Sequence, residues 1–406
     1  MAQQVIIVGG GMVGFAFAVA LRVRCPTIVV TLLEARELPS GEPDPLDTRA
    51  SALNLYSRRL LTESGVWPEI DPHVASIQTI HVSNQGRFGS SVIDCADVGE
   101  AQLGYVCENH HIGRGLLARS EQLGINLEAP VSVEGFSEDG DGSRVTLSDG
   151  RTLRADLVVL ADGGQSSLRE SLGIGVQTRN VGQVAVVANV AFAGEQEHRA
   201  FERFTASGPL AMLPLPSVQR HSARFNTVWS LPEPAAETIM DLDQHALMEQ
   251  LQRAFGWRLG AITAVGRPSY WPLVRTVARE QTRPGFLVAG NAAHGLHPVA
   301  GQGFNLSLRD ADTFAAVAAA AVSEGRSVGS REALDEYTER AADNQRRIID
   351  ATDLLATLFN RRGWLLDFPR DVALVALDTL APLRRQIAAM GTGQPSSMAS
   401  VMDAVR

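Results

Sequence analysis

Cysteine is scarce in this 406-residue sequence, which contains only Cys25, Cys95 and Cys107. The three residues are widely spaced, form no Cys-x-x-Cys pair, and are odd in number. This pattern fits a reducing compartment better than a disulfide framework. We expect all three side chains to behave as small buried hydrophobic groups.

Long hydrophobic runs are also missing. No uninterrupted apolar stretch reaches the length of about 18 residues that a transmembrane helix requires. The apolar N-terminal run has no basic segment before it and contains glycines in a binding pattern, which predicts strand, turn and helix rather than a signal peptide. We therefore expect a cytoplasmic protein.

A basic surface is absent as well. The formal net charge is -9 and no long run of lysine or arginine occurs, so nucleic acid is not an expected partner. Hydrophobic residues make up 45% and charged residues 20% of the chain, as is typical of a globular protein. The length exceeds what one hydrophobic core supports, which indicates two domains with discontinuous segments.

The N-terminal segment "QVIIVGGGMVGFAFAVALRVRCPTIVVTLLEA" has the pattern of a βαβ unit. Gly9, Gly11 and Gly14 form GxGxxG between the first strand and the helix, and Glu34 follows Gly14 by 20 residues at the end of the second strand. These glycines allow a tight turn, close approach to a pyrophosphate and close helix packing, while the carboxylate accepts from ribose hydroxyls. A dinucleotide site is expected; a purely structural glycine turn is the weaker alternative.

A second strand and turn, "ADLVVLADGGQSSLRE", places Asp162 and Gly163 after a buried apolar run. Ser166 and Arg169 follow on the next turn. This pattern is equally typical of an ordinary strand end before a capped helix, so both interpretations stay open.

A third glycine-containing loop follows the apolar strand "FLVAG". The loop starts at Asn291, and a helix is expected to begin near Asn305. Glycines before a helix leave backbone N–H groups free to hold an anionic or electron-rich ligand. A nicotinamide dehydrogenase needs one such loop, whereas a long bent cofactor can use one at each end.

Four stretches together carry a family resemblance: GxGxxG with Glu34, "DTRASAL", "LADGGQSSLRE" and "GNAAHGLHPVAGQGFNLSLRD". From about residue 4 to about residue 390 the chain resembles the FAD-dependent aromatic hydroxylases of the para-hydroxybenzoate hydroxylase fold. Within that group it is most similar to the ubiquinone-biosynthesis hydroxylases. "GPLAMLPL" and the segment "LFNRRGWLLDFPRDVALVALD" also resemble that family.

The resemblance implies an α/β (α+β) fold: a Rossmann-like FAD-binding domain, an inserted β-sheet substrate domain and C-terminal helices. Residues 1–75, 100–180 and 273–360 are expected to form the FAD-binding domain. Residues 76–99 and 181–272 are expected to form the substrate-binding sheet domain, and residues 361–406 a C-terminal helical segment.

The resemblance also assigns cofactor contacts. Gly9, Gly11 and Gly14 would hold the FAD pyrophosphate, and Glu34 the adenosine ribose. The remaining cofactor candidates are Arg49 from "DTRASAL", Asp162 from the "ADG" turn, Asn291 near the ribityl or pyrophosphate region, and Pro298, Gly301, Gln302, Gly303 and Asn305 around the isoalloxazine. The helix near Asn305 would direct its positive end at the flavin ring.

The reaction implied is a monooxygenation with NAD(P)H and O2 as co-substrates. NAD(P)H reduces FAD, O2 forms a flavin C4a-hydroperoxide, and this species hydroxylates a polyprenyl phenol in ubiquinone biosynthesis. The flavin carries the chemistry, so no catalytic residue is assigned; His297 and Pro298 are the candidates nearest the flavin. The alternatives are a related hydroxylase acting on another phenol and a non-catalytic FAD- or NAD-binding protein.

One residue departs from the superfamily pattern. Most members have aspartate where this chain has Asn291. An amide still accepts from a ribityl hydroxyl and removes a negative charge beside an anionic cofactor, so binding should survive. Asparagine here resembles the 2-polyprenyl-6-methoxyphenol hydroxylase branch.

Three further features leave alternatives open. His294 and His297 lack an evident third ligand, so no metal site is expected. "GPLAMLPL" is either plain core or a strand facing the substrate pocket, in which case Met212 and Pro214 contact substrate. The C-terminal "FPRDVALVALDTLAPLRR" either packs on the FAD domain or docks on a membrane surface or a partner protein of ubiquinone biosynthesis.

Overall fold

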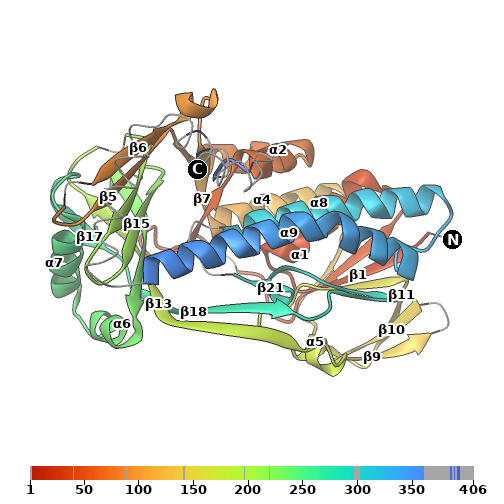
Figure 1. Ribbon diagram of the computed structural model, residues 1–406. Helices are drawn as coiled ribbons and strands as arrows, with labels where there is room; N and C mark the ends of the chain where they lie inside the picture. The colour runs from red at the N-terminus through yellow and green to blue at the C-terminus, as the bar shows by residue number, and fades with distance from the viewer. Residues whose placement is uncertain are drawn as a thin grey trace, which may run out of the picture.

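The fold is known from a computed structural model, which describes residues 2–39, 41–87, 89–139, 142–195, 197–218, 220–296, 302–360, 385, 388 and 391–393. Two sheets dominate it, and they lie at opposite ends of the molecule in Figure 1. Two small three-stranded sheets complete the architecture.

The first sheet has the strand order β19-β20-β12-β1-β2-β8. All its pairs are parallel except β19 with β20. The β-branched and leucine-rich strands β1, β2, β12 and β20 are largely buried on both faces, as parallel strands usually are. The strands are β1 (Gln4–Val8), β2 (Val29–Leu33), β8 (Asn126–Glu128), β12 (Leu157–Leu160), β19 (Thr282–Arg283) and β20 (Phe286–Val288).

Helices cover one face of this sheet, and a small sheet covers the other. Phe17, Phe314 and Tyr337 meet in the helical layer, with ring centroids 6.5 Å and 5.6 Å apart along this series. The helices of this layer are α1 (Met12–Arg24), α2 (Leu55–Glu63), α3 (Trp67–Ile70), α4 (Asn109–Gln122), α8 (Gln302–Ser323) and α9 (Arg331–Asn360). The short helix α5 (Ser167–Ser171) packs on the other face, and 3-10 turns occur at Asp71–His73, Cys95–Val98 and Gly290–Ala292. The small sheet comprises β9 (Val133–Asp139), β10 (Gly142–Leu147) and β11 (Thr152–Ala155).

The second large sheet is nine-stranded and mostly antiparallel. Helices α6 (Glu233–Met240) and α7 (Gln244–Phe255) cover its outer face, on the left of Figure 1. Its inner face meets the second small sheet, which comprises β3 (Ala50–Leu53), β4 (Val74–Ile77) and β7 (Gly104–Glu108). The nine strands are β5 (Thr79–Asn84), β6 (Ser90–Asp94), β13 (Val176–Phe192), β14 (Arg199–Phe204), β15 (Pro209–Leu215), β16 (Ala223–Pro232), β17 (Ile262–Val265), β18 (Ser269–Ala278) and β21 (His294–Gly295).

The long strands β13 and β18 connect the two ends of the molecule along the lower edge of Figure 1. Each passes through a domain boundary expected from the sequence, at 180/181 and at 272/273. The boundaries therefore fall inside continuous strands rather than in linkers, and the proposed division stays a prediction.

Leu53 ends β3, so a strand separates Arg49 from α2. Strand pairing with β7 fixes this segment, which helical spacing of leucines could not reveal. Helix α8 begins at Gln302 rather than near Asn305. Glycine is tolerated there because the first-turn N–H groups have no partner inside the helix.

Candidate cofactor and substrate site

Four strands of the parallel sheet deliver the predicted cofactor residues to one edge. β1 leads to Gly9, β2 to Glu34, β12 to Asp162 and β20 to Asn291, and these strands are neighbours in the order β20-β12-β1-β2. The carboxyl ends of parallel strands meet at the same sheet edge, which is where such folds bind ligands. The edge therefore brings together residues from four distant parts of the sequence.

The first glycine loop is built by close backbone contacts. Gly9 has a φ of +110°, and a Cβ there would lie 2.4 Å from the Ala161 carbonyl oxygen. A Cβ on Gly14 would lie 1.9 Å from the Gly9 carbonyl oxygen, so both positions require glycine. In contrast, a Cβ on Gly11 would meet no atom within 4 Å. Gly11 is also the residue before α1 and caps it with no side chain, so the N–H groups of the first turn are available to a phosphate.

Glu34 lies beside this loop. Its Oε2 accepts a 2.6 Å hydrogen bond from the Gly10 N–H, and its Oε1 accepts from the Arg36 N–H at 3.0 Å. Each carboxylate oxygen retains a lone pair for a further donor such as a hydroxyl. The carboxylate is thus fixed in place by backbone groups before any ligand arrives.

Asp162 ends β12 with an unsatisfied atom. Its Oδ1 is buried and has no hydrogen-bond partner among the described residues. Burial raises the pKa of Asp162, against hydrogen bonds and the charge of Arg169, which lower it. A buried acceptor without a donor is costly, and a ligand hydroxyl would satisfy it.

Arg169 joins the Asp162 turn to the loop after β20. Its guanidinium is almost fully buried, and Nη1 donates to the carbonyl oxygens of Ala292 at 2.9 Å and Gly164 at 3.3 Å. Ser166 caps the short helix that positions Arg169 by accepting from its N–H. The turn is therefore a capped helix start, and the cofactor contact of Asp162 stays a prediction.

The loop after β20 packs against the first glycine loop. Gly290 has a φ of +60°, and a Cβ there would lie 2.8 Å from Cγ1 of Val13 in α1. The next residue, Asn291, is exposed. The two loops expected at opposite ends of a cofactor are thus in direct contact at this point.

The start of α8 is fixed by Asn305. Its Nδ2 donates to the Ala52 carbonyl oxygen at 2.8 Å, and its Oδ1 accepts from the Asn54 N–H at 3.1 Å. The Asn305 side chain therefore ties α8 to β3. Gln302 and Gly303, in the first helical turn, are partly exposed, and a Cβ on Gly303 would meet open space. His297, Pro298 and Gly301 lie outside the described residues.

Arg49 lies beside β18 of the nine-stranded sheet. Its guanidinium lies 5.1 Å from the ring centroid of Trp271 on β18, and its side chain is exposed. The adjacent Thr48 is buried, where its backbone carbonyl and hydroxyl oxygens accept from Asn189 Nδ2 at 2.9 Å and 2.7 Å. The "DTRASAL" loop is therefore held against the nine-stranded sheet.

The sequence analysis did not predict a buried polar network that lies beside this loop. Arg224 on β16 is fully buried; its Nη2 donates to Glu108 Oε1 and to the Pro45 carbonyl oxygen, both at 2.6 Å. Glu108 also accepts from the Thr48 hydroxyl. The one available signal was an arginine inside the strand sequence "ARFNTVWSLP", since a buried arginine requires a partner.

His294 belongs to another buried network. Its Nε2 lies 2.8 Å from Gln281 Nε2, and its Nδ1 lies 3.9 Å from Asp310 Oδ2 in α8. Burial lowers the pKa of His294 to about 4 and raises that of Asp310 to about 7. Gln345 in α9 donates to Asp310 at 3.1 Å. Among the described residues, no group of three or more His, Cys, Asp or Glu side chains is arranged to hold a metal ion.

Met212 is a core residue and does not line a pocket. Its side chain is fully buried with Phe201, Phe225 and the residues of α6 and α7, and its sulfur accepts from the Thr227 hydroxyl at 2.9 Å. Pro214 is also buried and shares this outer face, since side chains alternate along a strand. The pocket alternative for "GPLAMLPL" was thus wrong for Met212, because the inward residues of β15 are the intervening ones.

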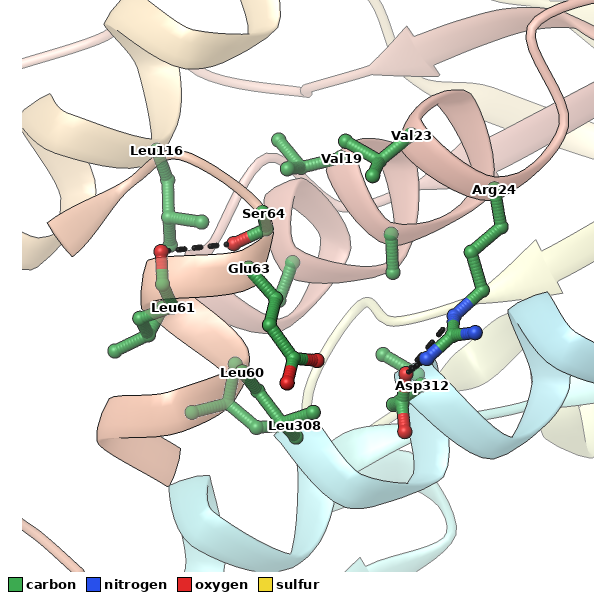
Figure 2. Close-up of a pocket in the computed structure, with 13 residues that line it drawn as sticks. Val19, Val23, Arg24, Leu60, Leu61, Glu63, Ser64, Leu116, Leu308 and Asp312 are labelled. Atoms are coloured by element: carbon green, nitrogen blue, oxygen red, sulfur yellow. Dashed lines mark hydrogen bonds and ion pairs between the residues drawn. The ribbon is translucent and has the colours of Figure 1, made fainter. Parts of the chain in front are cut away.

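An apolar surface pocket of about 230 Å³ lies between α1, α2, α4 and α8. Figure 2 shows Val19 and Val23 of α1 facing Leu60 and Leu308 across it, with the Arg24–Asp312 ion pair at its rim. No predicted cofactor residue lines it.

Within the described part of the chain, no helix combines the length and apolar character needed to cross a membrane.

The geometry defines a class: a dinucleotide-binding α/β protein whose phosphate-binding edge faces a second, antiparallel sheet domain. A model of the FAD binding domain family matches residues 2–352. Ubiquinone hydroxylase UbiL of Rhodospirillum rubrum is 34% identical over 401 residues, covering 96% of this chain and 90% of that protein. 3-Demethoxyubiquinol 3-hydroxylase of Escherichia coli is 29% identical over 385 residues, covering 94% and 96%. The crystal structure of p-nitrophenol 4-monooxygenase PnpA from Pseudomonas putida superposes with a TM-score of 0.78 at 18% identity, covering 98% of this chain and 99% of that one.

The chain belongs to the FAD binding domain family and is a FAD-dependent aromatic hydroxylase related to the ubiquinone hydroxylases. This confirms the expected cofactor and fold. The residues present fit FAD, because Gly11 leaves open space at a helix start and Asp162 presents a buried acceptor without a donor. When bound, FAD supplies the redox chemistry of monooxygenation.

Proposed function

We propose that this protein hydroxylates the aromatic ring of a polyprenyl phenol in ubiquinone biosynthesis, with NAD(P)H and O2 as co-substrates. The observation that carries the proposal is the extent of the match to a ubiquinone hydroxylase, which covers 96% of the chain and so includes the nine-stranded sheet as well as the FAD-binding half. The likeness therefore includes the part of the molecule expected to select the substrate.

In this proposal each site residue has a defined task. Gly9, Gly11 and Gly14 let the backbone approach the FAD pyrophosphate, and Glu34 accepts from the adenosine ribose. Asp162 and Asn291 accept from hydroxyls of the cofactor chain. Arg49 contacts the cofactor from the inner side, while the first turn of α8, with Gln302 and Gly303, and the preceding Pro298 and Gly301 enclose the isoalloxazine. The helix start stabilises negative charge on the ring.

The substrate branch rests on Asn291. Asparagine at this position favours 2-polyprenyl-6-methoxyphenol as the substrate over later ring-substituted intermediates. A related hydroxylase acting on another phenol is the alternative.

The test begins with purified protein. We expect a yellow protein with one FAD per chain, which oxidises NAD(P)H faster when a methoxyphenol with a short prenyl tail is added, and incorporates one oxygen atom from labelled O2 into the ring. A colourless protein that cannot be reconstituted with FAD would contradict the proposal. Mass spectrometry of quinone intermediates in a strain lacking the gene then identifies the ring position; an unchanged quinone profile favours another phenol.

Membrane docking of the C-terminal segment is a separate proposal. Most of this segment lies outside the described residues, but Ala388 packs with Ile77, Ala200 and Leu215 on the inner side of the nine-stranded sheet. Liposome flotation of the full chain and of a version ending before Phe368 tests docking. Equal partitioning of the two forms would exclude it.

A further inference from the structure

The inner face of the nine-stranded sheet carries one row of accessible side chains. Strand pairing aligns Glu202 with Ala211 on one side and with Val82 on the other. Ala211 is in register with Val228, Val228 with Val187, and Val187 with Ser269. All six residues of this row are partly exposed: Val82, Glu202, Ala211, Val228, Val187 and Ser269.

The neighbouring rows on the same face are mostly buried. Two residues along the strands in one direction lie Ala200, Asn226 and Asn189, which are 3%, 1% and 1% exposed. In the other direction lie Ser230 and Ala185, which are 3% and 0% exposed. The accessible row is thus a strip between buried rows, on a sheet that the cofactor-binding half covers.

Glu202 points toward the cofactor-binding half because side chains alternate along a strand. Its neighbour Phe201 and the paired Met212 face outward into the core beneath α6 and α7. The opposite face holds Ala200 and Leu215, which pack against Val106 of β7 in the FAD-binding half. Glu202 therefore lies on the side of the sheet from which the cofactor edge is reached.

Glu202 is also the one charged residue of the row, and no hydrogen bond or ion pair engages its carboxylate among the described residues. Burial alone raises the pKa of Glu202 to about 7, with no neighbouring charge contributing. Glu108, which faces the same side, differs because Arg224 neutralises it at 2.6 Å. Its neighbours in the row, Val82 and Ala211, are apolar, so a ligand hydroxyl on this strip would be a hydrogen-bond partner that the protein itself does not supply.

We propose that Glu202 binds the ring hydroxyl of the phenol and accepts its proton, with the aromatic ring lying on the apolar strip formed by Ala211, Val228 and Val187. This inference rests on the proposed function. The phenol O–H bond breaks and a bond forms between that proton and a Glu202 carboxylate oxygen, so that the electron pair stays on the ring oxygen. The ring becomes more electron-rich at the carbons ortho and para to this oxygen. After hydroxylation the proton returns from Glu202 to the same oxygen, which makes the hydroxyl neutral again.

The raised pKa of Glu202 suits a group that accepts this proton. A general base works best when its pKa lies near the operating pH, because it is then both ionised and able to accept. The apolar strip strengthens the effect, since a hydrogen bond to a charged acceptor is worth more where water is excluded.

The first test needs no turnover. Perturbation of the flavin absorbance of the oxidised, FAD-containing enzyme gives the Kd of 2-methoxyphenol as a function of pH. We expect wild-type affinity to increase about 3- to 10-fold as pH rises through about 7, because the ionised carboxylate is the stronger acceptor. The methyl ether 1,2-dimethoxybenzene, which has no hydroxyl proton, should show no such rise.

Variants make the test specific. Glu202→Gln is nearly isosteric and removes a desolvated charge, so it should fold and retain FAD, while the rise in phenol affinity disappears. Its kcat for hydroxylation should fall about 100-fold or more, and Glu202→Asp should recover part of it. The matched control is Glu134→Gln, an exposed glutamate on β9 that should leave kcat and the pH profile unchanged.

The outcomes separate two failures. A wild-type enzyme that binds FAD but neither binds nor hydroxylates phenols overturns the proposed function itself. A wild-type enzyme that hydroxylates phenols while Glu202→Gln keeps the same kcat and the same pH-dependent Kd overturns only the role of Glu202. An equal pH dependence for the phenol and its ether in wild type would do so without any variant.

Discussion

The proposed cofactor edge and the proposed substrate face differ in the groups that form them, which are backbone groups in the first and side chains in the second. At the carboxyl edge of the parallel sheet, backbone groups form the site, and glycine is required where a Cβ would collide with a carbonyl oxygen. On the inner face of the nine-stranded sheet, the polar groups are side chains, such as the buried Arg224 and the partly exposed Glu202, and no unusual backbone conformation marks their positions. A backbone-built site leaves a pattern of glycines in the sequence, whereas a side-chain-built face appears only when strands are paired.

The sharpest test of the backbone-built region compares two glycines of one motif. Gly14→Ala places a Cβ 1.9 Å from the Gly9 carbonyl oxygen, so we expect the turn to be displaced and FAD content to fall at least 10-fold. Gly11→Ala meets no protein atom, so the apoprotein should unfold at nearly the wild-type temperature. FAD absorbance and thermal unfolding measure both effects. Equal stability of the two apoproteins would show that close packing does not set this loop.

The dinucleotide site could be predicted from the sequence because the residues of its first motif are close together in the chain. The strand, the GxGxxG turn and Glu34 lie within one βαβ unit, so spacing alone indicates a dinucleotide site. Asp162 and Asn291 were placed through the family resemblance, and the structure brings both to the same edge because β12 lies between β1 and β20. Nothing in the linear order of these strands predicts that adjacency.

The side-chain-built region predicts the next largest effect. Arg224→Met leaves Glu108 as a buried carboxylate without its cation, so we expect the free energy of unfolding to fall by about 3 to 5 kcal/mol. Denaturant unfolding of the FAD-containing protein measures it. Arg59→Met is the control: Arg59 forms an exposed ion pair with Glu63, and its loss should cost less than about 1 kcal/mol. Similar losses of unfolding free energy in the two variants would show that the buried pair stabilises the protein no more than the exposed pair does.

Sequence reasoning could not find this pair because its members lie 116 positions apart on different sheets. The same holds for Met212, for which the sequence left core and pocket open and which strand alternation places in the core. Assigning a face to a strand residue requires knowing which face the helices cover. That information comes from tertiary packing, which a single sequence does not specify.

Asp310 in helix α8 leads to a prediction about how the stability of the protein depends on pH. Burial raises the pKa of Asp310 to about 7, so the folded state binds a proton more tightly than the unfolded state does. The free energy of unfolding therefore falls as pH rises from about 4 to about 7. Asp310→Asn keeps an acceptor for Gln345 and removes this loss, so it should stabilise the protein by about 1 to 3 kcal/mol near pH 8.

Thermal unfolding near pH 4.5 and near pH 8 measures this difference. At the lower pH, Asp310 retains its proton in the folded protein and the variant should match wild type closely. The buried His294, with a pKa lowered to about 4, contributes in the opposite direction and only on the acid side. A stabilisation of the same size at both pH values would mean that packing, rather than ionisation, explains it.

The smallest expected effect concerns Asn291, the residue that departs from the superfamily pattern. Asn291 is exposed, so a carboxylate introduced by Asn291→Asp remains solvated and its repulsion of an anionic cofactor is screened. We expect the Kd for FAD to change by less than about 10-fold, because a carboxylate accepts from a hydroxyl as an amide oxygen does. If Asn291 also selects the substrate branch, the variant should shift the ratio of kcat/KM between 2-polyprenyl-6-methoxyphenol and more substituted phenols while FAD content stays constant. An unchanged ratio would assign substrate choice to the side-chain-built inner face alone.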